Sequence, residues 1–204
     1  MFESFTENQQ DAVVILKKDH AKVKDLFDQF EETEQRAQKI RIAAMVIKEL
    51  KAHAAVEEEI FYPTVRATVG DKIMNEALEE HHVAKMLIAE LEKMTGVEDQ
   101  FDAKFTVLAE NIRHHIEEEE DDMLPRAREA DIDFEELGEA LLARKQELMQ
   151  KGFPVLPEER LVGVRKGGPL NPGKTAVPSR SKKRSPTRSR AGKKDDTRSE
   201  RPIA

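Results

Sequence analysis

Apolar residues recur at intervals of three and four along most of the first 151 residues, which is the spacing of one face of an α-helix. The first such segment, 11–30, carries Val13, Leu16, Val23, Phe27 and Phe30 at this spacing. No segment shows the sustained alternation of apolar and polar residues that marks a half-buried strand. The pattern therefore predicts an all-α protein.

Four long helices and a shorter fifth are predicted, over residues 11–30, 35–66, 71–95, 99–129 and 134–150. Gly70 and Asp71 supply a break and an N-cap between the second helix and the third. Long amphipathic helices with short connections favour an antiparallel up-down four-helix bundle. We expect this bundle, with the short fifth helix, to form one domain over residues 1–151.

Polar residues lie within the apolar faces of all four long helices. Each helix has one histidine in register with its apolar residues: His20, His53, His81 and His115. Glu57 and Glu119 follow the second and fourth of these histidines by four residues, so each pair shares a helix face. An unpaired charge is costly on a buried face, so these six side chains need a partner.

The body of the chain contains an internal repeat. The segments HAAVEEEIFYP (53–63) and HIEEEEDDMLP (115–125) both have Glu four and five residues after His, and Pro ten residues after it. The segments LKKDHAKVKDLF (16–27) and LEEHHVAKMLI (78–88) correspond in the same way. The sequence therefore predicts a doubled helical hairpin, in which each copy has one His on its first helix and a His-x3-Glu pair on its second.

The repeat distinguishes between adjacent histidines. When the two prolines are superimposed, His115 matches His53, and His114 does not. Apolar residues stand three, six and seven positions after His20, and the same offsets from His81, not from His82, reach Ala84, Leu87 and Ile88. We therefore expect His82 and His114 to flank the site.

The acidic runs 57–59 and 117–122 contain more carboxylates than a site needs, and most of them are expected on a solvated face. Within these runs, Glu58 and Glu120 are the residues best placed to contact the ligand side chains without binding the metal themselves. Tyr62 lies nine residues after His53, on the opposite face of a regular helix, so we expect it only to pack.

Imidazole and carboxylate are good ligands for iron, manganese and zinc, and two Glu on different helices are suited to bridging a pair of cations. The absence of Cys excludes thiolate sites and disulfides. A single His on an apolar face is more often a hydrogen-bonded core residue, and a single His-x3-Glu pair more often lies on the surface. The repeated pattern in register with four apolar faces favours a metal site.

Charge divides the chain into two parts. Residues 152–204 contain 14 Lys/Arg and 5 Asp/Glu, a net charge of +9, which leaves 20 basic and 36 acidic residues, a net of −16, in residues 1–151. The basic part is rich in Pro, Gly, Ser and Arg, and we expect it to be a disordered tail. It is a solubilising tail, or one that folds back on the acidic body of the same or a neighbouring molecule. The functional alternative is an arm for weak, non-specific contact with nucleic acid or another polyanion.

Residues 11–129 resemble the hemerythrin-like domains of the HHE cation-binding family, of the bacterial type. The matching residues are Asp19-His20, HAAVEEEIFYP, Glu80-His81 and HIEEEEDDMLP. The resemblance implies a non-haem di-iron centre, with two iron ions joined by an oxo or hydroxo bridge. It also implies terminal ligands at His20, His53, His81 and His115 and bridging carboxylates at Glu57 and Glu119. Manganese and zinc accept the same ligand types.

The chain departs from the oxygen-carrying hemerythrins, which have a fifth histidine ligand one turn from another on the third helix. Ala77 and Lys85 stand one turn on either side of His81, so the chain offers six ligands instead of seven. An open position of this kind admits small molecules such as dioxygen, nitric oxide or peroxide to the metal.

Three functions are consistent with these features. The leading one is binding or sensing of a small molecule at a di-iron centre. The second is an enzyme that consumes peroxide or nitric oxide there, and the third is a stress-related interaction protein whose tail binds polyanions; the sequence leaves enzymatic activity open. The N-terminus lacks the basic region and apolar core of a signal peptide, and no apolar run reaches membrane-spanning length, so we expect a cytoplasmic protein without a membrane partner.

Overall fold

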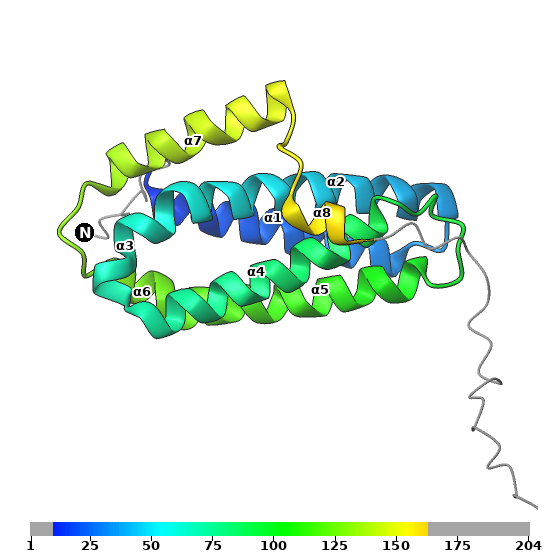
Figure 1. Cartoon of the computed structure of the whole chain (residues 1–204), viewed down its shortest axis with the longest axis horizontal. Helices are drawn as coiled ribbons and strands as arrows, with labels where there is room; N and C mark the ends of the chain where they lie inside the picture. Colours follow the sequence, from blue (N-terminus) through cyan, green and yellow to red (C-terminus); the bar gives the residue numbers. More distant parts are fainter. Residues whose placement is uncertain (1–9, 163–204) are drawn as a thin grey trace, which may run out of the picture. The chain divides into compact units, whose positions relative to one another are not determined.

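The structure, a computed structural model, describes residues 10–162. Within this range every regular element is helical and no strand is present (Figure 1). The prediction of an all-α protein is therefore confirmed. None of the helices in residues 10–162 combines the length and apolar character needed to cross a membrane.

The first helical hairpin contains four consecutive segments: α1 (Ala12–Glu32), α2 (Arg36–Val56), η1 (Glu57–Phe61) and α3 (Tyr62–Val69). Asp11 caps α1, because its carboxylate accepts hydrogen bonds from the backbone N–H groups of Val13 and Val14 at 2.9 and 3.2 Å. The segments α2, η1 and α3 follow one another without a break and together span the predicted second helix, 35–66.

The second hairpin repeats this order with α4 (Asp71–Leu91), α5 (Phe101–Glu118), η2 (Glu119–Met123) and α6 (Leu124–Ala127). Gly70 joins the two hairpins with a φ of 98°, a backbone conformation that a residue with a Cβ rarely adopts. The helices α1, α2, α4 and α5 lie side by side (Figure 1).

Both η1 and η2 are π-helical, and both begin at a predicted bridging glutamate. The carbonyl of Glu57 accepts a hydrogen bond from the N–H of Tyr62, five residues later, and the carbonyl of Glu119 accepts one from Leu124. A proline follows each π-helical segment after one residue, at Pro63 and Pro125. A proline ring clashes with the carbonyl four residues before it in a regular helix, so the wider turn accommodates the ring.

Two further helices pack against these hairpins. The helix α7 (Phe134–Lys151) lies against α1 and α2. Its bounds nearly match those of the predicted fifth helix, 134–150. The short α8 (Pro157–Leu161) packs against α4. The predicted disordered tail began at residue 152, but residues 153–161 contact the helices. Glu158 and Glu159 form ion pairs with them, and the ring of Phe153 packs against the apolar core. The rest of that predicted tail, 163–204, lies outside the described residues.

The apolar core has two parts, with the polar positions between them. One part contains Phe27, Phe30, Val46, Phe105 and Leu108, and the other contains Leu16, Phe61, Met74, Leu124 and Leu141. Along α1, His20 lies between Leu16 of one part and Val23 of the other. The packing on both sides therefore fixes the height at which the four helices present their histidines.

Candidate metal centre

The structure brings all six predicted site residues together in one buried group, here called the six-residue cluster: His20, His53, Glu57, His81, His115 and Glu119. Each of these residues is at most 5% exposed. The histidines come from α1, α2, α4 and α5, and the two glutamates open η1 and η2. The histidine predicted from each adjacent pair lies in this group, and so does the glutamate predicted from each acidic run.

The Nε2 atoms of the histidines meet in two pairs. His20 and His53 bring their Nε2 atoms to 3.1 Å, and His81 and His115 bring theirs to 3.0 Å. Glu57 lies between the pairs, with one carboxylate oxygen 3.2 Å from Nε2 of His53 and the other 3.4 Å from Nε2 of His81. This carboxylate is thus positioned to link two neighbouring ligand sets.

Glu119 makes the corresponding contacts from the other hairpin. Its Oε2 lies 3.2 Å from Nε2 of His20 and 3.6 Å from Nε2 of His115. Glu57 and Glu119 therefore each face two histidines, one from each pair. The donor set consists of four imidazole nitrogens and two carboxylates, which suits a pair of cations of the iron, manganese or zinc type.

A second set of carboxylates faces the Nδ1 atoms of the histidines. Glu120 contacts His20 at 2.9 Å and Glu58 contacts His81 at 2.8 Å, so both residues expected to support the site do so. Two more contacts involve the residues that precede the histidines of α1 and α4.

Asp19 lies 3.5 Å from Nδ1 of His53, and Glu80 lies 2.7 Å from Nδ1 of His115. Each residue thus reaches the histidine on the other helix of its own hairpin, and sequence reasoning did not assign these roles. The signal was present, because Asp19 and Glu80 occupy equivalent positions of the repeat.

These contacts test whether the cluster fits a metal. An Nδ1 atom that faces a carboxylate carries the hydrogen, which leaves the Nε2 lone pairs directed at one another. Both carboxylate oxygens of Glu57 are buried and have no hydrogen-bond partner among residues 10–162. Cations between the histidine pairs satisfy these atoms and offset the cost of burying the carboxylates, so the cluster fits a metal-binding site.

Burial and neighbouring charge also shift the pKa values of the cluster. Burial, together with the nearby His20, lowers the pKa of His53 to about 4. The neutral imidazole, which is the form that binds metal, is therefore favoured at this position. Burial and the adjacent Glu119 carboxylate raise the pKa of Glu57 well above its usual range.

Tyr62 corrects a prediction. Its hydroxyl donates a 2.8 Å hydrogen bond to Oε1 of Glu119, and its ring stacks on His81 with centroids 5.5 Å apart. The prediction that it only packs was wrong because it assumed a regular helix. The wide turn of η1 adds about one residue, which sets later side chains back by about 100°. The proline at 63 was the signal for this turn.

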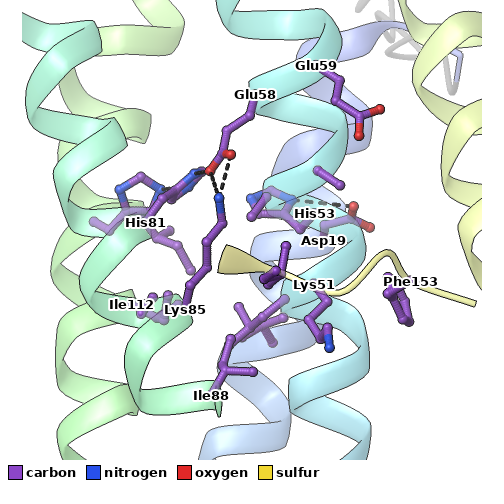
Figure 2. A pocket seen from close by; sticks show the side chains of 18 of the residues that line it. Asp19, Lys51, His53, Glu58, Glu59, His81, Lys85, Ile88, Ile112 and Phe153 are labelled. Atoms are coloured by element: carbon purple, nitrogen blue, oxygen red, sulfur yellow. Dashed lines mark hydrogen bonds and ion pairs between the residues drawn. The ribbon is translucent and has the colours of Figure 1, made fainter. Parts of the chain in front are cut away.

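A cavity of about 90 Å³ reaches the cluster from between α2 and α4. All four histidines line it, and apolar side chains such as Leu50, Ile88 and Ile112 form much of its remaining wall (Figure 2). Lys85 and Glu58 form an ion pair inside it. The space holds several molecules of the size of water or a diatomic gas.

The connection between α7 and α8 covers part of this cavity. Phe153, Pro154 and Leu156 line the cavity wall, and Lys51 lies 5.7 Å from the centroid of the Phe153 ring. Lys51 also pairs with Glu159 of α8 at 3.0 Å.

The two flanking histidines lie outside the cluster, as predicted. The side chain of His82 is 49% exposed and contacts Glu158 of α8, while that of His114 is 63% exposed and lies 3.3 Å from Glu118.

Comparison with known proteins relates this geometry to a family. Residues 11–127 match the Hemerythrin HHE cation binding domain. A solved Hemerythrin HHE cation binding domain-containing protein from Mycobacterium kansasii is similar over 70% of this chain and 94% of its own, with a TM-score of 0.58 and 25% identity. A DNA nickase from Nostoc sp. is 26% identical over 114 residues, which are 56% of this chain and 32% of the nickase.

The chain therefore spans only about a third of that nickase, whose activity is a property of that protein. The domain match covers more than half of the chain and all six clustered residues. Together with the all-helical fold and the buried His/Glu cluster, it shows that this chain belongs to the hemerythrin HHE cation-binding family.

Proposed function

We propose that the six-residue cluster holds two iron ions and that the protein binds or senses a small molecule there, such as dioxygen, nitric oxide or peroxide. In this arrangement His20 and His53 would hold one ion and His81 and His115 the other, with Glu57 and Glu119 available to both. Iron supplies a redox-active cation with room for an external ligand. The proposal includes the antiparallel four-helix bundle typical of such centres.

The observation that carries the ligand-binding part is the cavity between α2 and α4. It connects the four histidines with the outside, and its volume of about 90 Å³ suits a molecule of a few atoms. Its apolar wall favours neutral gases over hydrated ions, because a charge loses its water there. The protein contributes access, exclusion of bulk water and fixed histidine orientations.

The residues around the cluster support this role. The carboxylates of Glu58, Glu80 and Glu120 hold three of the imidazoles in one tautomer and orientation, and Asp19 lies 3.5 Å from Nδ1 of the fourth, that of His53. Tyr62 holds one oxygen of Glu119, so that the other faces His20 and His115. The cluster is therefore held in place by the protein before any ligand arrives.

Metal analysis and an optical spectrum of the protein purified with its native metal test the proposal. We expect about two irons per chain, and we expect Glu57→Ala with Glu119→Ala to lose them. Addition of nitric oxide or azide should change the spectrum of the iron-loaded protein only. Equal, negligible iron in the wild type and the double variant after reconstitution contradicts the proposal.

An enzyme that consumes peroxide or nitric oxide is the second candidate. The ion pair between Lys85 and Glu58 favours it, because a proton donor and a proton acceptor lie within the cavity beside His81. Turnover of either substrate at a rate proportional to bound iron supports this function. Stoichiometric binding without turnover supports the binding protein.

The basic residues of the segment 152–204 suggest a separate contact. With a net charge of +9, residues 152–204 suit weak, non-specific binding to nucleic acid or another polyanion. Binding to duplex DNA that weakens steeply with salt, and is lost when the chain ends at Val162, supports this contact. If metal-free protein binds DNA equally well, the contact is independent of the centre.

A further inference from the structure

A second group of possible ligands lies next to the six-residue cluster. Glu80, His114 and Glu118 each offer one ligand atom, and these three atoms lie within 4.8 Å of one another. We call them the outer cluster. Glu80 is partly buried, whereas His114 and Glu118 are exposed, so the outer cluster opens to solvent.

The outer cluster lies in a groove of about 570 Å³ between α4 and the segment α5–η2. Its wall carries six carboxylates besides Glu119, namely Glu76, Glu80, Glu117, Glu118, Asp121 and Asp122. Lys72 is the one lysine or arginine among the residues lining this groove. A concave surface lined by one sign of charge focuses the electric field and concentrates cations.

The groove also reaches the candidate centre. Glu119 and His115 both form part of its wall. Glu119 is 1% exposed, and its Oε2 is buried without a hydrogen-bond partner among the described residues. The groove that holds the outer cluster therefore shares two wall residues, His115 and Glu119, with the six-residue cluster, where this oxygen faces His20 and His115.

The repeat shows that this arrangement is not needed to build a hairpin. Ala52 and Val56 of the first hairpin occupy the positions of His114 and Glu118. Both are buried, and Val56 belongs to the apolar group that α7 completes. Among residues 10–162 no helix covers the equivalent position of the second hairpin, where His114 and Glu118 line the groove.

The two openings differ in chemistry. The cavity between α2 and α4 has a largely apolar wall and suits small neutral molecules, whereas the groove is acidic. We propose that Glu80, His114 and Glu118 form a transit site that captures a divalent cation from solvent and delivers it along the acidic groove to Glu119 and His115. This inference rests on the proposed metal centre for the delivery step, whereas capture does not depend on it.

Uptake kinetics of the full metal-free chain test the delivery. Under anaerobic conditions, we expect His114→Ala with Glu118→Gln to take up Fe(II) about tenfold more slowly than the wild type at low micromolar metal. The final content should remain two ions per chain, because neither residue belongs to the six-residue cluster. Glu110→Gln is the control, since it removes the same charge from an exposed position of α5 outside the groove.

Glu80 is left intact because it holds His115. An uptake rate unchanged by His114→Ala with Glu118→Gln, or slowed equally by Glu110→Gln, overturns the delivery step. Slower uptake in the double variant alone supports it.

Capture is measured separately with Mn(II), whose free concentration is counted by electron paramagnetic resonance. Glu57→Gln with Glu119→Gln disables the centre, and we expect one weaker Mn(II) site to remain. Adding His114→Ala and Glu118→Gln should remove it. If the weaker site persists after these changes, or is never present, the transit site is wrong. If the wild type holds no central iron but the weaker site is present, the proposed function fails and the capture site stands.

Discussion

Tyr62 Oη donates a 2.8 Å hydrogen bond to Glu119 Oε1 and so connects the first helical hairpin to a glutamate of the second. Both residues are buried, at 3% and 1% exposure. Burial and the charge of Glu119 raise the pKa of Tyr62 well above its usual range, so the hydroxyl remains a donor at neutral pH. The bond fixes one oxygen of Glu119 and leaves the other facing two histidines.

Tyr62→Phe should lower the free energy of unfolding of the metal-free protein by about 1–3 kcal/mol, because a buried carboxylate oxygen loses its donor. The phenylalanine ring retains the stacking on His81. Urea unfolding monitored by circular dichroism measures the change. Unaltered stability would show that Glu119 obtains a donor elsewhere. A hydroxyl introduced next to Tyr62 by Phe61→Tyr should not restore the lost stability, because position 61 lies in the apolar core.

Glu58→Gln and Glu120→Gln should each weaken metal binding by about 10–100-fold, because each removes the carboxylate that orients one histidine. The repeat places these residues at equivalent positions, so we expect losses of similar size. Competition with a chelator of known affinity gives the values. Glu59→Gln is the matched control, since its exposed side chain pairs with Arg144. Equal weakening in all three would indicate a general effect of charge.

Metal affinity should fall as the pH is lowered, because the metal-free cluster holds protons that the metal must displace. Burial and Glu119 raise the pKa of Glu57, so this group retains a proton to higher pH than an ordinary glutamate. Burial alone would lower the pKa of His115, but the carboxylates of Glu119 and Glu80 raise it. Groups with raised pKa values release protons on metal binding, and this release opposes binding increasingly as the pH falls.

Calorimetry in buffers of different ionisation enthalpy counts the released protons. We expect net release on metal binding near neutral pH, and a smaller release in Glu57→Gln. His53, with a pKa of about 4, should contribute nothing above pH 6 because it is already neutral. Binding that is independent of pH between 5.5 and 7.5 would show that Glu57 and His115 carry no displaceable proton.

A chain ending at Lys151 should bind azide or nitric oxide faster than the full chain once metal is loaded. It lacks Phe153, Pro154 and Leu156, which line the cavity, and Glu159, which pairs with Lys51. A chain ending at Val162 keeps these contacts and should react at the rate of the full chain. Stopped-flow absorbance compares the three. Identical rates would mean that the α7–α8 connection does not limit access.

Much of the fold and of the cluster was predictable because both depend on helical periodicity. The apolar spacing in the first 151 residues predicts four long helices and a fifth, since burial of an apolar face is what stabilises such helices. The repeat then assigns His115 over His114 and Glu57 over its neighbours, because one helix face can point inward only at a fixed spacing. Glu58 and Glu120 were also predicted, from within the two acidic runs, to support the site.

Three features depended on the tertiary structure. The π-helical turns at Glu57 and Glu119 change the direction of later side chains, so Tyr62 faces the cluster although regular spacing places it opposite. Asp19 and Glu80 reach histidines on neighbouring helices, and such contacts follow from how helices pack.

The third feature is α8, which is attached to the helices by pairs such as Glu159 with Lys51 and Glu158 with His82. These partners are 108 and 76 residues apart in the sequence. Within regular helix, the spacing of apolar residues was enough to identify the side chains that face the core, because that direction follows local periodicity. Which of these side chains meet, and where solvent reaches them, could be read only from the folded chain, because those distances depend on the packing of one helix against another.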